Sequence, residues 1–244
     1  MPLVVAADGR RHVLAIGGFA GGRFDQGVPP LVRHAVELAG KPSPRVCLIG
    51  TAMGDDAASV LRGYAWLQAA GAQPSHLQLF PMPNVTDPAG LLLAQDVIYV
   101  GGGSVAGLAA VWRVHGLDEV MRRAWEAGIV LAGVSAGALC WFEGGTTDSF
   151  GPRLRPFTGG LGLLAGSYCP HYSSEPARRP LYEELVAAGT LPPGVACDDG
   201  AAAHYVDGAL ATIVTEQADR HGYRVEPDGA GGVTSTTLAE ELLQ

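Results

Sequence analysis

The sequence lacks the features that mark zinc-binding, membrane-spanning and nucleic-acid-binding proteins. None of its 4 cysteines forms a Cys-x-x-Cys pair, and no apolar run approaches the roughly 18 residues that a membrane-spanning helix needs. The net charge of −8 offers no excess of basic residues for nucleic acid. The apolar start of the chain is too short for a signal peptide. We therefore expect a cytoplasmic protein that uses no metal and binds neither nucleic acid nor a membrane.

The chain also lacks an internal repeat and any linker that would separate two domains. Its 244 residues, of which 48% are hydrophobic and 16% charged, suit an ordinary globular protein. We expect one domain over residues 1–244. The cysteines at positions 47, 140, 169 and 197 are expected to be reduced, buried apolar residues.

Apolar runs alternate with helical patterns in the first 142 residues. This alternation is typical of a parallel sheet with helices on both faces, and such sheets bind ligands beyond the carboxyl ends of their strands. Three of the apolar runs end in glycines, where backbone can approach a ligand closely. The patterns predict strands at 12–18, 45–52, 76–82 and 96–104, helices at 29–40 and 58–72, one or two helices at 105–128, and a strand turning into a helix at 129–142.

After Phe142 the pattern weakens into Gly-, Pro-, Ser- and Thr-rich sequence that predicts loops with short strands. A helix is predicted at 178–189, and antiparallel edge strands at 208–217 and 222–229. The last segment, 234–244, begins with Thr and Ser residues that favour a helix N-terminus, so a terminal helix is predicted there.

The strongest local motif is Gly133-Val134-Ser135-Ala136-Gly137. It matches the Gly-x-Ser-x-Gly nucleophile elbow, in which a strand turns sharply into a helix and exposes the serine hydroxyl. An apolar strand pattern precedes it and an apolar helix start follows. The motif therefore predicts Ser135 as a nucleophile and the backbone N–H of Ala136 as an oxyanion donor. The alternative is a plain strand–helix turn with a capping serine.

A second glycine cluster, Gly101-Gly102-Gly103-Ser104, follows the strand predicted before it. A phosphate-binding P-loop is improbable because the Gly-x-x-x-x-Gly-Lys spacing is missing. The better interpretation is a second oxyanion donor, the backbone N–H of Gly103 or of Ser104. A tight turn without a catalytic role is the alternative.

A serine nucleophile needs a base, and histidine suits neutral pH. Of 7 histidines, His171 lies in the polar half of the chain within Cys-Pro-His-Tyr, and His204 is the second choice. The residues alone do not decide which acid would orient the base. Its candidates are Asp148, Glu175 and the pair Asp198-Asp199, each of which could instead cap a loop.

Taken in order, these segments resemble the serine peptidases of the peptidase E family and the related cyanophycinases. The resemblance rests on Gly17-Gly18, on Val-Gly-Gly-Gly-Ser at 100–104, on Gly-Val-Ser-Ala-Gly-Ala at 133–138, on Thr-Asp-Ser at 147–149, on Cys-Pro-His-Tyr at 169–172 and on Asp-Asp-Gly at 198–200. It implies an α/β fold with a mostly parallel sheet flanked by helices, the three-layer, flavodoxin-like fold of class I glutamine amidotransferases. No cofactor is implied.

The resemblance also implies roles for single residues. Ser135 corresponds to the nucleophile and His171 to the base, with Gly103 and Ala136 at the oxyanion hole. Asp199 corresponds to the family's glutamate as third member, although it is one methylene shorter. The remaining correspondences are Asp148 with another acidic residue implicated in the family, and Ser104 with an asparagine that contacts substrate.

Aspartyl dipeptidases of this family cleave after an N-terminal aspartate that an arginine recognises. The corresponding residue here is Arg178 or Arg179, whose alternative role is that of a solvated arginine at a helix start. The expected substrate is a short Asp-X peptide, and a homodimer is kept open. The other functions considered are a cyanophycinase-like or other carboxyl-directed amidase, and an inactive relative that binds an acidic peptide or metabolite.

Overall fold

The computed structural model describes residues 6–20 and 27–243. Residues 1–5 of the apolar N-terminal segment, which is too short for a signal peptide, lie outside this range, as does Gln244 at the end of the predicted terminal helix. No helix of the described ranges is both long enough and apolar enough to span a bilayer.

The larger sheet of the described chain has eight strands in the order β14-β11-β10-β1-β5-β4-β2-β3. Five neighbouring strands of this sheet, β1, β5, β4, β2 and β3, are parallel to one another. Strand β10 runs antiparallel to β1 and to β11. The strands are β1 (His12–Ile16), β2 (Arg45–Ile49), β3 (Gln73–Leu77), β4 (Val97–Val100), β5 (Val130–Val134), β10 (Ala201–Val206), β11 (Ala209–Thr215) and β14 (Glu240–Leu242).

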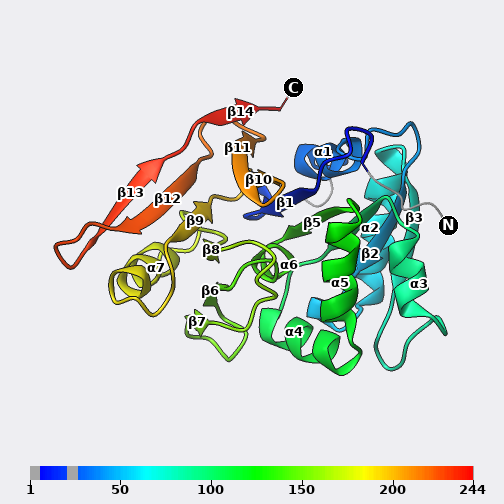
Figure 1. Cartoon of the computed structure of the whole chain (residues 1–244), viewed down its shortest axis with the longest axis horizontal. Coiled ribbons are helices and arrows are strands. Elements are labelled where there is room, and N and C mark those ends of the chain that lie inside the picture. The colour runs from blue at the N-terminus through cyan, green and yellow to red at the C-terminus, as the bar shows by residue number, and fades with distance from the viewer. Residues whose placement is uncertain (1–5, 21–26, 244) are drawn as a thin grey trace.

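Helices cover both faces of this sheet (Figure 1). Side chains of β1, β2, β4 and β5 alternate between two apolar clusters, as the pleat of a strand requires. One face packs against α1 (Pro30–Glu37) and α2 (Ala57–Ala69). The other face packs against α3 (Pro88–Leu93), α4 (Val105–Val114), α5 (Leu117–Glu126) and the short α6 (Ala136–Leu139). The predicted three-layer, flavodoxin-like α/β fold is confirmed.

A second sheet of six strands, in the order β13-β12-β9-β8-β6-β7, stands beside the larger one. Its central strands β6, β8 and β9 are parallel, and α7 (Arg178–Ala187) packs against it (Figure 1). The strands are β6 (Gly144–Thr147), β7 (Arg155–Phe157), β8 (Ser167–Cys169), β9 (Gly194–Cys197), β12 (Gly222–Pro227) and β13 (Val233–Thr237).

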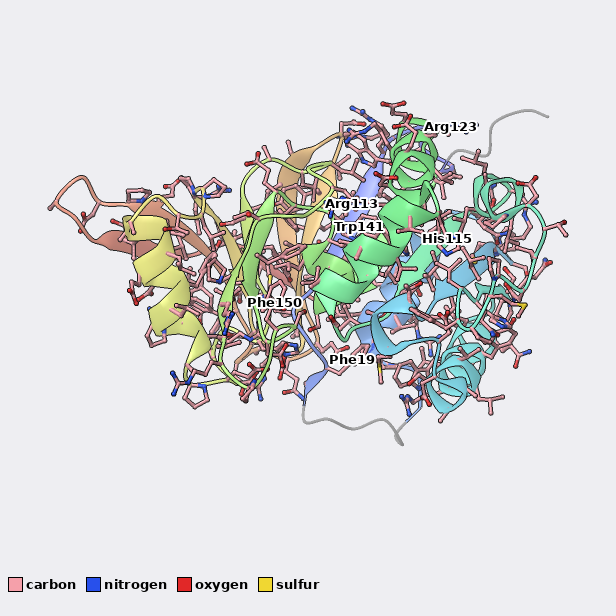
Figure 2. All side chains as sticks on the ribbon, turned by 90° about the horizontal axis from the view of Figure 1, so that it is seen from below. Phe19, Arg113, His115, Arg123, Trp141 and Phe150 are labelled. Carbon is pink, nitrogen blue, oxygen red and sulfur yellow. The ribbon has the colours of Figure 1, made fainter. Side chains whose placement is uncertain are left out.

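Buried aromatic side chains join the two sheets. The Tyr168 hydroxyl of β8 donates a hydrogen bond to the Ala15 carbonyl of β1 (2.8 Å), and the ring of Tyr168 stacks on Phe142 with centroids 4.8 Å apart. Trp141 packs against Trp112 of α4, beside the green helices of Figure 2. The junction fixes the carboxyl ends of strands from both sheets next to one another, where we find the candidate site.

The predicted C-terminal helix at 234–244 is wrong. Residues 233–237 instead form β13, which pairs with β12, and residues 240–242 form β14, which pairs with β11. The run of β-branched threonines favours a strand, and the unpaired edges of both sheets provide partners that local helix propensity cannot outweigh. For the same reason β11 and β12 are not the edge strands that the sequence predicted.

The third predicted strand, 76–82, also differs from the structure, in which β3 covers Gln73–Leu77. This strand lies at the edge of the larger sheet, where polar residues and a proline are tolerated because one side makes no ladder. Pro74 and the polar residues around it hid the strand from a search for apolar runs.

Candidate active site

Ser135 lies at a sharp turn between β5 and α6, with φ 55° and ψ −114°. Both flanking glycines of the motif are required by close backbone contacts. A side chain on Gly133 would collide with the Gly137 carbonyl, and one on Gly137 would collide with the Val100 carbonyl of β4. The backbone N–H of Ser135 donates to the Ile16 carbonyl (2.9 Å). Strand, turn and helix therefore have the arrangement of a nucleophile elbow.

Backbone N–H groups of two residues lie at this turn. Ala136 begins α6, and the first N–H of a helix has no acceptor within the helix. Gly103 has a φ of 129°, which suits glycine, and its N–H donates no backbone hydrogen bond within the described ranges. Ser104, the alternative donor, is occupied because its N–H donates to the Ala52 carbonyl (2.8 Å). Gly103 and Ala136 are therefore the available pair.

The Ser104 side chain has a structural role. Its Oγ accepts a hydrogen bond from the Gly107 N–H (3.0 Å) and so caps α4. Ser104 lines neither of the two pockets beside Ser135, although its neighbours Gly103 and Val105 do. The structure does not bring this predicted substrate contact into the site.

His171 follows β8 and lies against Ser135. Its Nε2 is 2.8 Å from Ser135 Oγ, and its Nδ1 is 2.6 Å from Asp199 Oδ1. The backbone of the next residue, Tyr172, donates to the Cys197 carbonyl at the end of β9 (3.1 Å). Because β8 and β9 are parallel neighbours, their carboxyl ends bring the histidine and the aspartate together.

Asp199 is the acid that the structure places on His171. Burial would raise the pKa of Asp199, but hydrogen bonds from His171 and Ser174 and the charges of His171 and Arg220 bring its pKa below the ordinary value. The neighbouring Asp198 points elsewhere and accepts from the His221 N–H (3.0 Å). A carboxylate held ionised beside Nδ1 favours the tautomer in which Nε2 can accept the serine proton.

The glycine pair after β1 makes room for this contact. A side chain on Gly18 would collide with the Asp199 carboxylate and with the His171 ring, and one on Gly17 would collide with the Asp198 carbonyl. Gly18 and Asp199 also form an isolated parallel bridge, in which the Gly200 N–H donates to the Gly18 carbonyl (2.9 Å). The third glycine cluster of the sequence thus belongs to the site.

The two other candidate acids do not contact the His171 side chain. Glu175 pairs with Arg178, with its Oε2 2.7 Å from the arginine Nε. Asp148 is exposed and lies, together with Ser135 and Arg178, in the lining of a small pocket of about 10 Å³. Asp148 is therefore close to the serine but away from the histidine that it was expected to orient.

Only one of the two candidate arginines faces this small pocket. The side chain of Arg178 is 4% exposed, and its Nη1 donates to the Thr146 carbonyl (2.8 Å). Arg179 has a side chain that is 47% exposed, pairs with Glu183 at 3.0 Å and lies over the Tyr172 ring. Arg179 lines neither pocket beside Ser135.

His204, the second choice for the base, belongs to a separate histidine cluster. Its Nε2 is 3.0 Å from Nδ1 of His12, and its ring packs edge-on against His34. Burial, and then the neighbouring His12 and His34, lower the pKa of His204 to about 4. It makes no contact with Ser135 among the hydrogen bonds of the described residues.

This cluster predicts that acid weakens the fold. The pKa of His204 is lower in the folded protein than its value of about 6.5 in the unfolded chain, so the unfolded chain binds a proton more readily. The free energy of unfolding is therefore highest above pH 6.5 and decreases as the pH falls toward 4. In thermal melts between pH 7.5 and 4.5, H204Q should lose less Tm than the natural protein. The exposed H115Q variant is the control. Equal pH slopes for H204Q and the natural protein would contradict this assignment.

A larger cavity of about 520 Å³ also borders Ser135. Sequence reasoning missed it, because its walls come from ordinary core residues of α2 and the strand ends. Contributors include Leu48, Val60, Trp66 and Tyr99, together with Phe19, which is labelled in Figure 2. Only the fold brings these residues next to the serine.

The rest of the described structure adds no metal site. All four cysteines are buried and free. Within residues 6–20 and 27–243, no group of three or more His, Cys, Asp or Glu side chains is placed to hold a metal ion.

Comparison with known proteins gives the family. The model of peptidase family S51 matches residues 19–213. The uncharacterized peptidase YgaJ of Bacillus subtilis (strain 168) is 40% identical over 215 residues, which cover 88% of this chain and 92% of that protein.

Two solved structures share the fold. A peptidase from an acI-B1 Actinobacterium has a TM-score of 0.69 at 17% identity, with 95% of each chain covered. A candidate peptidase E protein from Listeria monocytogenes EGD-e has a TM-score of 0.62 at 19% identity, with 86% of this chain and 100% of that chain covered. Since the family model spans most of the sequence, the chain belongs to peptidase family S51 and is a peptidase.

Proposed function

We propose that this peptidase is a serine hydrolase in which Ser135, His171 and Asp199 act as a catalytic triad. The observation that carries the proposal is the continuous chain of contacts from Ser135 Oγ to His171 Nε2 (2.8 Å) and from His171 Nδ1 to Asp199 (2.6 Å). In the first step Ser135 Oγ attacks the scissile carbonyl while His171 accepts the hydroxyl proton.

The oxyanion that forms is stabilised by the N–H groups of Gly103 and Ala136. The intermediate then collapses: the C–N bond breaks, and the leaving amine takes the proton from His171. This leaves an ester on Ser135. Water, deprotonated by the same histidine, attacks the ester and releases the acid, and the proton returns to Ser135. No redox step or co-reactant besides water is needed.

We further propose that the substrate is a short peptide with an N-terminal aspartate. Arg178 supports this, because it lines the small pocket together with Ser135 and Ala136. Its hydrogen bonds to Glu175 and Thr146 use three of the five N–H groups of a guanidinium. At about 10 Å³ the pocket holds no more than one water-sized group, so an aspartate side chain would reach Arg178 only with a shift of neighbouring side chains.

The test compares Asp-X with Asn-X dipeptides, which differ mainly in charge. A charge-assisted contact with Arg178 should favour Asp by at least about fivefold in kcat/KM, because charged hydrogen bonds exceed neutral ones by about 1 kcal/mol or more. R178M should erase most of that preference. R179M removes an exposed arginine of the same helix turn and is the matched control, which should keep it.

Labelling of Ser135 by a fluorophosphonate should persist in both variants and shows that the triad is still assembled. Equal rates for Asp-X and Asn-X in the natural protein would contradict the aspartyl-dipeptidase proposal. The serine mechanism would then stand, and a different carboxyl- or amide-directed substrate would have to be sought.

A further inference from the structure

The cavity of about 520 Å³ has a chemistry that the proposed triad does not explain. Its volume lies within the range of about 300–1,000 Å³ that is usual for small-molecule sites. Its walls are mainly apolar, with Val32, Leu48, Val60, Leu67 and Trp66 among them. The apolar part of this wall favours an apolar side chain over a charged or strongly hydrated one.

The two pockets beside Ser135 differ in which catalytic groups they include. Ser135 and Gly103 line both. Ala136, a candidate oxyanion donor, lines only the small pocket with Arg178, whereas His171 and Asp199 line only the large cavity. The scissile carbonyl would therefore lie between the two, over Ser135.

The position of the histidine assigns the two halves of a substrate. In serine hydrolysis the general acid must reach the leaving nitrogen, so the leaving group lies on the side of the histidine. The acyl half, which becomes the ester on Ser135, then lies toward Ala136 and Arg178. This places the residue that follows the scissile bond in the large cavity.

We propose that the large cavity is the leaving-group subsite and that it selects peptides whose second residue has a bulky aliphatic or aromatic side chain. This inference rests on the proposed serine mechanism and names its substrate class more closely: Asp-Leu or Asp-Phe rather than Asp-Gly. Trp66 and Phe19 form an edge-to-face pair in the wall, with ring centroids 5.4 Å apart. Their apolar surface would contact such a side chain.

The wall of the large cavity also carries the positive charge of Arg62. Arg62 Nη2 donates to Ser59 Oγ (3.1 Å), and the guanidinium carbon lies 5.9 Å from the centroid of the Trp66 ring. Gly63 lets α2 pack closely on the sheet, since a side chain there would collide with Leu48. The helix is thus fixed against β2, and Gly63 and Leu48 both line the cavity.

The experiment measures kcat/KM for Asp-Gly, Asp-Leu and Asp-Phe with the natural protein and with a graded series at Val60. Burying a large apolar side chain should favour Asp-Leu and Asp-Phe over Asp-Gly by at least about tenfold. V60L, V60F and V60W fill the cavity in steps and should lower this preference in steps, because they slow the hydrolysis of Asp-Leu and Asp-Phe more than that of Asp-Gly. If V60W fails to fold in thermal melts, V60L and V60F still give the trend.

The matched control is L61W, since Leu61 is the next residue of α2 and is 72% exposed. L61W should keep the full preference for Asp-Leu and Asp-Phe. Asp-Gly hydrolysed as fast as Asp-Leu by the natural protein would overturn this inference and leave the proposed function standing. Loss of preference in L61W equal to that in V60W would overturn it as well. If no Asp-X peptide is hydrolysed, the proposed function falls, and the inference with it.

Discussion

Replacing Ser135 with Ala is expected to lower kcat/KM for an Asp-X dipeptide by about 10⁴- to 10⁶-fold. The hydroxyl is the group that would form the acyl-enzyme, and no other hydroxyl of the described residues lies on His171 Nε2. The free energy of unfolding should change by less than about 1 kcal/mol. Alanine meets the same backbone strain at φ 55° as serine, because both carry a Cβ.

The matched control is S75A, which removes a hydroxyl from β3 at the far edge of the larger sheet. S75A should keep the activity of the natural protein. Rates are measured with purified, melt-tested protein by release of free aspartate. Activity of S135A within tenfold of the natural protein would remove Ser135 as the nucleophile.

The second large effect is expected at His171. H171A should lose nearly as much activity as S135A, because without a base the serine hydroxyl is a weak nucleophile. The double variant should be little worse than either single variant, since members of a catalytic unit do not contribute additively. D199N should lose about 10³- to 10⁴-fold, because an asparagine no longer holds the histidine in the required tautomer.

H204A and D148N are the controls for the roles of His171 as the base and Asp199 as the acid. His204 contacts His12, and Asp148 makes no contact with the His171 side chain, so neither should reproduce the losses of H171A and D199N. Inactivity of H204A together with activity of H171A would reverse the assignment of the base. A larger loss in D148N than in D199N would reverse that of the acid.

The elbow around Ser135 could be predicted from the sequence because its determinants are local. Gly133 and Gly137 are needed by contacts within the turn and with the adjacent strand, and a five-residue motif records that need. The parallel sheet could be predicted as well, since each buried strand is a short apolar run. The structure confirms both the position of the turn and the layers around it.

The two partners of Ser135 in the proposed triad are brought to it by contacts between segments that lie far apart in the chain. His171 and Asp199 are 28 positions apart, and only the parallel pairing of β8 with β9 brings them together. From the residues alone, Asp148, Glu175 and the pair Asp198-Asp199 were equal candidates for the acid. The resemblance to peptidase E favoured Asp199, and the structure places that carboxylate on the histidine. The large cavity had no motif, because apolar wall residues look like any other core.

Local signals misled where pairing decided the structure. Thr and Ser residues at 234–237 predicted a helix start, but both sheets had free edges that this segment could join. The sequence left both Arg178 and Arg179 as candidates, with Arg178 preferred, but adjacent positions on a helix point in different directions and only one of the two can face the site. The fold buries Arg178 beside the serine and exposes Arg179.

The most direct test of the central claim, an activated Ser135, is reaction of the native protein with a fluorophosphonate followed by peptide mass spectrometry. The account predicts a single adduct on Ser135 in the natural protein, none in S135A, and labelling slowed by at least about a hundredfold in H171A, since a general base supplies about 10²–10⁴-fold. An adduct on another residue, or equal labelling of Ser135 with and without His171, would contradict it.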